Sequence, residues 1–597
     1  MRQRAAGERV WPGVLAGAFL FGLAASWQRW GNPLIDTGRE MNQPLRLAAG
    51  EALYSDVRHI YGPLSPWLHA ALFRLFDASL TILYADGIVT AALVLAIVYW
   101  LACQVMRPAA AGAATLSVMF LCVFKPAGNY LLPYSYNALH GTLLSLTTLA
   151  LVVGALRRPA GGVALRFAAA GVAAGLAMLA KTEAGLAAMS AGVAGAALSS
   201  AGEARHRILH DTVFLATALG LTAAGYAVAA RQAGWSTLLG DSWLLAYNVP
   251  PELRHYNAWI SGLDDPLRSL RRVITAALKL GILAALIAAV SNIRVRRTDP
   301  ASHPGWPPAR VLGIAAGAAI LLSITVGLDW DKGPYLAMPL LLGGLIVLLI
   351  REHRKASPAD ARPAILLTCS VFALVSLARM ILHVRSGGAH ASFLLPVSVV
   401  LFTYLWVGPF AARFANARAG RLAAAIALSL ITFDAAATAL IQAYKYRTRQ
   451  TVPIQSARGT LVAAPDLGLA WNEALAFIRQ RTRPGETVAV MPEGTSLTFL
   501  SGRRHPLREE ITTPGFLDAD GEARAIRRLA ESATPLILVT NRPTAEFGAR
   551  VFGRDYNVRL MRWIEARYAT CAVLGPAGET DPEVGDEVFF IRAYCAR

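Results

Sequence analysis

The sequence predicts a polytopic α-helical membrane protein that carries an α/β domain at its C-terminal end, and three observations predict this class. Of the 597 residues, 55% are hydrophobic and only 16% are charged, which is too little polar surface for several soluble domains. Apolar stretches long enough to cross a bilayer recur up to about residue 442. After about Tyr444 the composition changes to the charges, turns and short apolar runs of a water-soluble fold.

The apolar stretches predict about thirteen transmembrane helices. The first, from Trp11 to about Trp27, follows Arg2, Arg4 and Arg9, a pattern shared by signal peptides and first membrane helices. Its length and the spans that follow favour an uncleaved helix. The others are predicted near residues 80–104, 110–125, 138–156, 165–180, 184–200, 211–230, 273–292, 310–327, 336–350, 363–381, 391–411 and 422–442. We therefore expect a transmembrane region over residues 1–443 and a second domain over residues 444–597.

Basic residues predict the orientation. The formal charge is +19, but Lys and Arg separate apolar stretches instead of clustering on one soluble face, which argues against nucleic acid as a partner. Short cytoplasmic loops of membrane proteins are rich in Lys and Arg. The loops predicted to face the cytoplasm hold Arg107, Arg157, Arg158, Arg166, Arg205, Arg207, Arg294, Arg296, Arg297, Arg351, Arg354, Lys355, Arg413, Arg418 and Arg421. This pattern predicts a cytoplasmic N-terminus and an extracytoplasmic C-terminal domain.

The C-terminal domain is predicted to alternate helices and strands. Helices are expected near 470–481, 521–531 and 557–566, and strands at 487–491, at 536–540 and near Cys571 and Phe589. Cys571 and Cys595 both fall in this extracytoplasmic part, where a disulfide between them and two free thiols are both open.

The first outer loop, residues 31–79, gathers ionisable side chains beside the membrane surface. They are Asp36, Arg39, Glu40, Asp56, Arg58 and His59. Loops on which polar side chains converge often carry function, although an ordinary solvated loop has the same composition. The second half of the loop, PLSPWLHAALFRLF, predicts an amphipathic helix at the interface.

Further ionisable residues fall at the ends of later helices on the same predicted side. They are Lys181 and Glu183 in AKTEAG, Asp329, Asp331 and Lys332 in DWDKGPY, and His383, Arg385 and His390 in HVRSGGAH. Any one of them is explained by snorkelling to the interface. Together they suit a phosphate-binding rim, because Arg offers a donor fork and Lys a compact charge. Tyr134 and Asn137 in KPAGNYLLPYSYN are candidate substrate contacts, or, for the tyrosine, part of an aromatic belt.

In combination these features resemble the GT-C superfamily of membrane glycosyltransferases, which take sugars from polyprenyl phosphate carriers. Asp36 lies just after the first helix, as the catalytic aspartate of that superfamily does. The run GEALYSDVRHIYGPLSP resembles the segment after that aspartate in bacterial members akin to protein mannosyltransferases and lipid A aminoarabinose transferase. LAKTEAG, PYSYN and EGTSLTFLSGRRHP also resemble pieces of such proteins. The layout of most of the chain matches, whereas the sequence matches only in these short segments.

The resemblance implies transfer of a hexosyl or pentosyl unit from a polyprenyl-phosphate-linked donor, held in membrane lipid, to an envelope glycan, lipid or protein. The reaction would take place on the outer face of a bacterial plasma membrane. Asp36 is the expected base for the acceptor hydroxyl, and a single displacement would invert the anomeric configuration. Many relatives carry paired acids here, whereas Thr37 follows Asp36, so Glu40 or Asp56 is the candidate second acid. The expected substrate-binding residues are Arg39, Arg58, His59, Tyr61, Tyr134, Asn137, Lys181, Glu183, Arg385 and His390.

Several points stay open at the level of sequence. Carboxylates suit Mg²⁺ or Mn²⁺, but no fixed ligand spacing assigns a metal ligand. A transporter or lipid flippase is an alternative, although its polar groups belong near the bilayer midplane and here they lie at helix ends. A polymerase or ligase that uses a lipid-linked glycan is a second alternative. Arg503, Arg504 and His505 in FLSGRRHP fit either a contribution to the active site or a solvated basic turn.

Overall fold

The computed structural model describes residues 2–157, 162–199, 204–242, 249–296, 313, 317, 333–357, 360–576 and 587–597. Within these ranges, eight helical stretches are long and apolar enough to cross a membrane. They are α4 (Leu80–Val105), α6 (Tyr136–Arg157), α7 (Val163–Ala180), α9 (Ala204–Ala233), α11 (Pro251–Ser261) with α12 (Pro266–Arg296), η2 (Pro334–Ala337) with α14 (Met338–Lys355), α15 (Arg362–Ser376) with η3 (Leu377–Met380), and α18 (Ala417–Arg449).

Shorter apolar helices complete the bundle. They are α1 (Arg2–Ser26), α5 (Pro108–Val118) with the π-helical turn η1 (Met119–Val123), α8 (Thr182–Ala197), and α16 (Ala391–Leu394) followed by α17 (Pro396–Leu405) and η4 (Trp406–Phe410). A helix therefore occupies every predicted span except 310–327. Apart from Gly313 and Gly317, that span lies outside the described residues, as do the predicted rim residues Asp329, Asp331 and Lys332. The number of membrane crossings stays a prediction.

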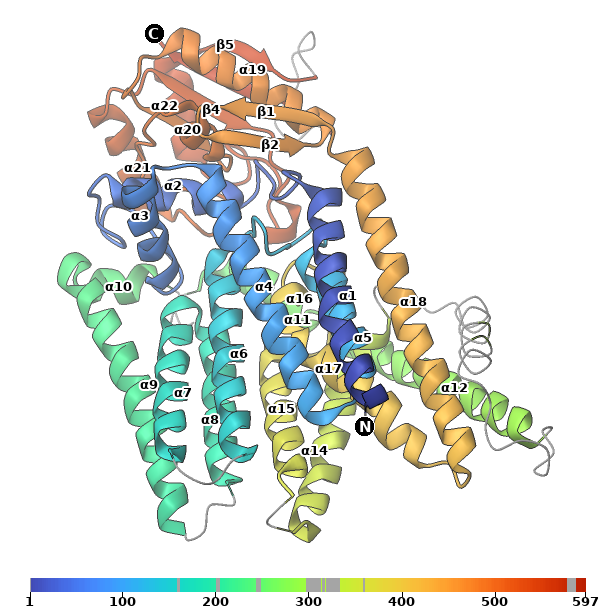
Figure 1. Cartoon of the computed structure of the whole chain (residues 1–597). Coiled ribbons are helices and arrows are strands. Elements are labelled where there is room, and N and C mark those ends of the chain that lie inside the picture. The colour runs from blue at the N-terminus through green and yellow to red at the C-terminus, as the bar shows by residue number, and fades with distance from the viewer. Residues whose placement is uncertain are drawn as a thin grey trace.

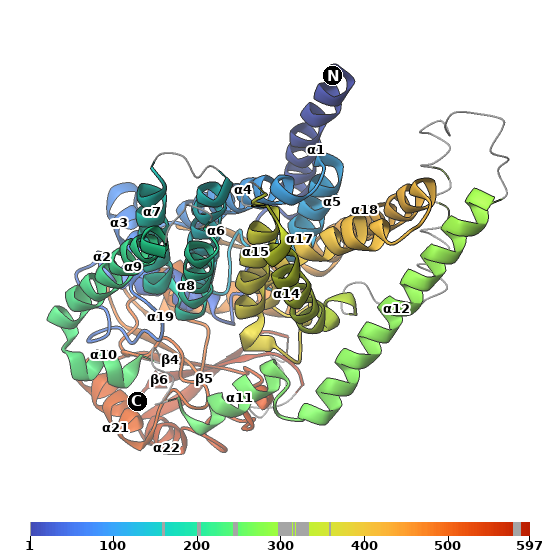
Figure 2. The same ribbon diagram turned by 90° about the horizontal axis from the view of Figure 1, so that it is seen from below.

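The bundle helices run roughly side by side, while α12 diverges from them, as the view from below shows (Figures 1 and 2). The helices α1 and α18 both end at the side covered by the C-terminal residues, which we call the capped end (Figure 1). The short helix α10 (Trp235–Asp241) follows α9 at this end.

The first loop forms a layer between the bundle and the C-terminal region (Figure 1). It contains α2 (Thr37–Ala48) and α3 (Leu64–Phe76), and α3 is the helix predicted from PLSPWLHAALFRLF. One face of α3 is buried, whereas Leu68, Leu75 and Phe76 are exposed, as expected for a helix at a membrane interface.

The C-terminal region is mixed α/β, and it contains elements near the predicted positions together with others that were not predicted. The strands β1 (Val452–Ser456) and β2 (Gly459–Ala463) form a hairpin, and β3 (Val488–Met491), β4 (Leu536–Thr540), β5 (Tyr568–Leu574) and β6 (Ile591–Ala596) form a sheet in the order β3-β4-β6-β5. β3 and β4 are parallel, and the other neighbours are antiparallel. The helices are α19 (Pro465–Arg481), α20 (Ser496–Ser501), α21 (Ala519–Glu531), η5 (Ala545–Phe547) and α22 (Val558–Arg567). The elements that were not predicted are the strands β1 and β2, the helix α20 and the turn η5.

The structure of this region can be compared with two further predictions, the pairing of two cysteines and the domain boundary. Cys571 and Cys595 form a disulfide that links β5 to β6. The expected boundary between residues 443 and 444 falls inside α18, which continues to Arg449 and leads directly into β1.

Buried polar contacts join the first loop to the C-terminal region. The Arg46 guanidinium lies 2.9 Å from the Glu510 carboxylate, and both side chains are almost fully buried. The side-chain amide of Asn42 donates to the same carboxylate at 2.8 Å. A buried ion pair is tolerated only when its hydrogen bonds are satisfied, so these contacts fix how the C-terminal region sits on the loop.

Candidate active site

A cavity of about 1180 Å³ lies at the capped end of the bundle. Its wall is built from the first loop, the ends of several bundle helices and the C-terminal region. Most of the lining is apolar, and a small number of charged and aromatic side chains converge on it, which is the usual composition of a ligand site.

Asp36 lines this cavity at the start of α2. Its side chain is 29% exposed, and its Oδ1 lies 3.3 Å from a guanidinium nitrogen of Arg39, one helical turn further on. The backbone of Asp36 has φ of +57°, which is uncommon for a residue with a side chain. The Asp36 carboxylate therefore lies at the cavity wall on a backbone with positive φ.

Arg39 connects Asp36 to the bundle. Its guanidinium donates to Glu40 Oε1 at 3.1 Å and to the carbonyl oxygen of Tyr134 at 3.3 Å, and it lies 5.6 Å from the centre of the Tyr61 ring. The other oxygen of Glu40 accepts the backbone N–H of Tyr136 at 2.8 Å. Glu40 is buried and does not line the cavity, so its placement supports a role in holding Arg39 and not that of a second acid.

Glu493 comes from the C-terminal region and lies directly against Asp36. The backbone N–H of Asp36 donates to its Oε1 at 2.6 Å, and Nε of Arg542 donates to its Oε2 at 2.9 Å. Burial raises the pKa of Glu493 to about 7, because the opposing effect of Arg542 is incomplete and the neighbouring Asp36 charge adds to the rise. Arg542 also binds Glu546 at 2.7 Å.

The parallel strands explain how Glu493 and Arg542 meet. Glu493 follows β3 and Arg542 follows β4, so the two residues lie beyond the carboxyl ends of adjacent parallel strands. Ligand sites of open α/β sheets commonly lie at this edge.

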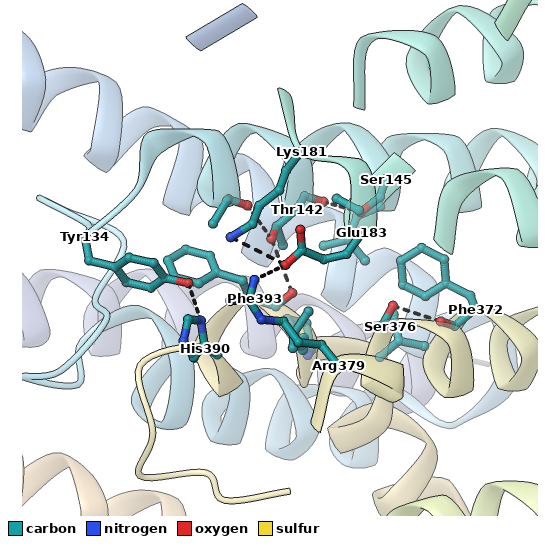
Figure 3. Close-up of a pocket in the computed structure, with 16 residues that line it drawn as sticks. Tyr134, Thr142, Ser145, Lys181, Glu183, Phe372, Ser376, Arg379, His390 and Phe393 are labelled. Atoms are coloured by element: carbon teal, nitrogen blue, oxygen red, sulfur yellow. Dashed lines mark hydrogen bonds and ion pairs between the residues drawn. The ribbon is translucent and has the colours of Figure 1, made fainter. Parts of the chain in front are cut away.

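A smaller cationic recess on the bundle side shares Tyr134, Glu183, Arg379 and His390 with the cavity. Figure 3 shows the side chains that line the recess. Arg379, on the 3₁₀ turn η3, forms an ion pair with Glu183, and Nζ of Lys181 lies 3.7 Å from the same carboxylate. The Lys181 ammonium also lies 4.8 Å from the centre of the Tyr61 ring. Two cations thus share one carboxylate, which leaves this recess net positive.

Tyr134 and His390 form the wall next to this recess (Figure 3). The Tyr134 hydroxyl lies 2.8 Å from Nδ1 of His390, and the Tyr256 hydroxyl lies 3.4 Å from Nε2 of the same ring. Burial, together with Arg379 and Lys181, holds the pKa of His390 well below its ordinary value, so the imidazole is neutral.

The cavity thus brings together Asp36, Arg39, Tyr61, Tyr134, Glu183 and His390 from the predicted set, with Lys181 in the adjoining recess. The remaining predicted residues lie elsewhere. Asp56 accepts the backbone N–H of Ala52 at 2.9 Å and shapes a turn of the loop. Arg58 donates to the carbonyl oxygen of Phe516.

Three more predicted residues have contacts away from the cavity. His59 is buried against Gln43, with its Nδ1 2.9 Å from the Gln43 side chain, and burial lowers its pKa to about 3. The Asn137 amide donates to the carbonyl oxygens of Gly62 and Ala180, both at 2.8 Å, and so ties the loop to the end of α7. Arg385 is exposed and does not line the cavity.

The FLSGRRHP segment does not contribute to the cavity, and of its three basic residues Arg504 alone is exposed. Arg503 is buried, and its guanidinium donates to the side chain and the carbonyl oxygen of Thr482, both at 2.9 Å. His505 is also buried, with its Nε2 3.0 Å from the carbonyl oxygen of Glu509. Neither residue lines the cavity, and neither is solvated.

Sequence reasoning missed Arg379, Glu493 and Arg542, although each left a signal. Arg379 is a lone cation within an apolar span, which is a marker of function in membrane proteins. Glu493 and Arg542 each follow a short apolar strand, VAVM and LILVT. That these strands are adjacent and parallel was not derivable from their spacing.

Among the acidic residues that line the cavity, Asp36 is ion-paired with Arg39 through Oδ1, and both Glu493 oxygens accept hydrogen bonds from the protein. Among the described residues, the group of His, Cys, Asp or Glu side chains close enough to share one ion is His69, Asp86 and His140. None of these three lines the cavity.

No protein-family model and no curated protein matches the chain. Among solved structures, the chain is similar to the oligosaccharyltransferase of Archaeoglobus fulgidus, with 14% identity and a TM-score of 0.49, over 96% of this chain and 73% of that one. It is also similar to AglB from the same organism in complex with an inhibitory peptide and a dolichol-phosphate, with 12% identity and a TM-score of 0.46, over 97% and 74% of the two chains. A third is ArnT from Cupriavidus metallidurans bound to undecaprenyl phosphate, with 14% identity and a TM-score of 0.43, over 98% of both chains. Because these TM-scores lie below 0.5, the function proposed below rests on the residues of this chain.

Proposed function

We propose that this protein is a membrane glycosyltransferase that moves a sugar from a polyprenyl-phosphate carrier to an acceptor hydroxyl. The observation that carries the proposal is that the Asp36 carboxylate and the Arg379 guanidinium line one cavity at the capped end of an apolar helix bundle. A base for the acceptor and a cation for the leaving phosphate are the two groups that this reaction requires. We assign the capped end to the extracytoplasmic side of the membrane.

Asp36 is the proposed base. The acceptor hydroxyl loses its proton to the Asp36 carboxylate as its oxygen attacks the anomeric carbon, and the bond from that carbon to the phosphate oxygen breaks. Arg39 holds the carboxylate from one side, and Glu493 accepts the Asp36 backbone N–H from the other. A one-step displacement of this kind inverts the configuration at the anomeric carbon.

Arg379 and Lys181 are the proposed partners of the phosphate. Both already share the Glu183 carboxylate, so a phosphate that enters the recess replaces part of this pairing and does not require an unpaired buried charge beforehand. Charge-assisted hydrogen bonds from a guanidinium stabilise the negative charge that the phosphate gains as it leaves.

Apolar residues give the cavity a suitable wall for the carrier. Leu132, Leu253 and Leu467 are among the lining residues, and a hydrocarbon chain gains about 25 cal/mol for each Å² of apolar surface that it buries there. Substrate contacts are assigned to Arg39, Tyr61, Tyr134 and His390. Arg58, His59 and Asn137 are assigned to the support of the loop.

The test is sugar transfer by the purified protein in lipid nanodiscs, with a panel of synthetic polyprenyl-phosphate sugars as donors. We measure release of the free polyprenyl phosphate for wild type, Asp36→Asn and Asp56→Asn. We expect Asp36→Asn to slow release by about 100-fold or more, the range for a lost general base. Asp56→Asn keeps an oxygen for the Ala52 N–H, so we expect its rate to stay within about threefold of wild type.

Full activity of a folded Asp36→Asn variant would contradict Asp36 as the base. Absence of carrier turnover with every donor, combined with movement of lipid or solute across reconstituted vesicles, would instead support the transporter alternative.

A further inference from the structure

Three side chains from three elements converge beneath the first loop, away from the cavity described above. Nε2 of His69, on α3, lies 3.0 Å from Oδ2 of Asp86, on α4. Nε2 of His140, on α6, lies 2.9 Å from the same oxygen. The three atoms all lie within 4.8 Å of one another.

The two histidines of this cluster are buried, and their rings are held in place by neighbouring side chains. His69 is 1% exposed and His140 is 5% exposed. The second ring nitrogen of His140, Nδ1, lies 2.9 Å from the Ser65 hydroxyl, which fixes the plane of the ring. The rings of Tyr136 and His69 pack against each other in a T-shaped arrangement, with the ring centres 4.3 Å apart. Metal-bound histidines are commonly held by such a contact to their other nitrogen.

We propose that His69, Asp86 and His140 form a binding site for one zinc-class divalent cation, which fastens the first loop to the helix bundle. Two imidazole nitrogens and one carboxylate oxygen suit Zn²⁺, whereas Mg²⁺ and Ca²⁺ prefer oxygen ligands throughout. With Zn²⁺ at about 2.0–2.2 Å from each ligand, tetrahedral ligands lie roughly 3.3 Å apart. The contacts of 2.9 and 3.0 Å would open by a few tenths of an ångström. The two imidazole nitrogens, which lie within 4.8 Å of each other, would move closer to reach the same spacing, and a water molecule takes the fourth position.

The position of the site indicates a structural role. α3 belongs to the first loop, whereas α4 and α6 belong to the bundle, so one ion would join all three. Tyr136, which packs on His69, donates its backbone N–H to Glu40, and Glu40 holds Arg39 beside Asp36. Metal binding therefore stabilises the layer that carries Asp36 without taking part in the reaction.

The experiment uses the full-length protein, purified in nanodiscs through a tag without histidine. After removal of bound metal with a chelator, Co²⁺ is titrated in as a spectroscopic probe, and Zn²⁺ content is measured after dialysis. The variants are His69→Ala and His140→Ala, with Ser65→Ala as a milder change. His210→Ala is the matched control, because His210 is a buried histidine on α9 outside the cluster.

We expect one Zn²⁺ per wild-type and control chain, a visible Co²⁺ absorption band typical of nitrogen and oxygen ligands, and loss of both in the two cluster variants. Ser65→Ala should weaken Zn²⁺ binding by about 10-fold, as loss of an outer partner does. Chelation should lower the thermal midpoint of wild type and leave that of the cluster variants unchanged.

Two outcomes would overturn the proposal. One is a wild-type protein that takes up neither Co²⁺ nor Zn²⁺, a result that needs no variant to fold and would make the cluster a hydrogen-bonded network only. The other is metal uptake that persists in folded His69→Ala and His140→Ala proteins, which would place the ion elsewhere.

Discussion

The most unusual single residue in the candidate site is Asp36. A residue other than glycine with φ of +57° carries a conformational cost of about 1–3 kcal/mol. Two contacts hold Asp36 in this state, the bond from its backbone N–H to Glu493 and the ion pair with Arg39. Such strain persists where the surroundings over-determine a conformation, so removal of one support is expected to change the position of the carboxylate.

Replacement of Glu493 tests this support. Gln has a single acceptor oxygen, so in Glu493→Gln either the Asp36 N–H or Arg542 loses its partner. A lost buried hydrogen bond of about 1.4 kcal/mol corresponds to a tenfold change, and we expect transfer to fall by about 10-fold. The measurement is kcat/KM for donor turnover. Glu531→Gln, at an exposed position on α21, serves as the control and should leave the rate unchanged.

The pKa of Glu493 predicts a pH dependence of stability. Because burial raises it to about 7 from an ordinary value of 4.5, the folded protein binds one more proton than the unfolded chain between these two values. Stability therefore falls as pH rises from about 4.5 to 7 and levels off above. Thermal midpoints of wild type should decline over this window relative to those of Glu493→Gln. Parallel pH profiles for the two proteins would contradict the raised pKa.

At the scale of elements, the site depends on how closely the start of α2 approaches the C-terminal region. A Cβ atom at Gly38 would lie 2.4 Å from the backbone nitrogen of Ser496, at the start of α20. The hydroxyl of Ser496 donates to the carbonyl oxygen of Pro33 at 2.5 Å, in the same stretch of the loop. Only glycine permits this approach, because the obstructing atom belongs to the backbone.

Gly38→Ala is therefore expected to push α2 away from α20 and to move Asp36 relative to Glu493. Overpacking of this kind costs about 1–3 kcal/mol, so both the thermal midpoint and donor turnover should fall. Gly17→Ala, on α1, is the control, since nothing lies within 4 Å of the added methyl group. A Gly38→Ala protein with wild-type stability and turnover would show that the two segments separate easily.

At the scale of the whole molecule, the sequence predicts the helices and strands more completely than the residues of the candidate active site. Apolar length and alternating composition located the bundle helices, α3 and the strands β3 to β6, because each of these signals is local in the sequence, whereas β1 and β2 were not predicted. The site residues Asp36, Arg39 and Tyr61 were also predictable, because all three belong to the first loop. Glu493 and Arg542 were not, because they reach the cavity only through the pairing of β3 with β4 and the docking of that sheet on the first loop. Glu40, His59 and Asn137 have polar side chains like those of ligand contacts. Their position away from the cavity lining, and not their burial, distinguishes them from the equally buried Arg39.

The buried pair of Arg46 and Glu510 is expected to hold the two regions together. Removal of one partner from a buried ion pair costs about 3–5 kcal/mol, because the other charge is left without compensation. Glu510→Ala should therefore lower the thermal midpoint by several degrees, measured by differential scanning fluorimetry in nanodiscs. Glu531→Ala, an exposed substitution, is expected to change it by little. An unchanged midpoint for Glu510→Ala would mean that other contacts suffice for docking.

The contact between Asp36 and Glu493 also sets an order of events during biosynthesis. The two residues are 457 positions apart, and at about 5–20 residues per second the ribosome needs roughly 20 to 90 seconds to pass from one to the other. Throughout that interval the nascent chain already has its first loop in place but has no partner for it. We therefore expect chains that are truncated before Glu493 to lack the proposed transfer activity, because their first loop has no partner from the C-terminal region.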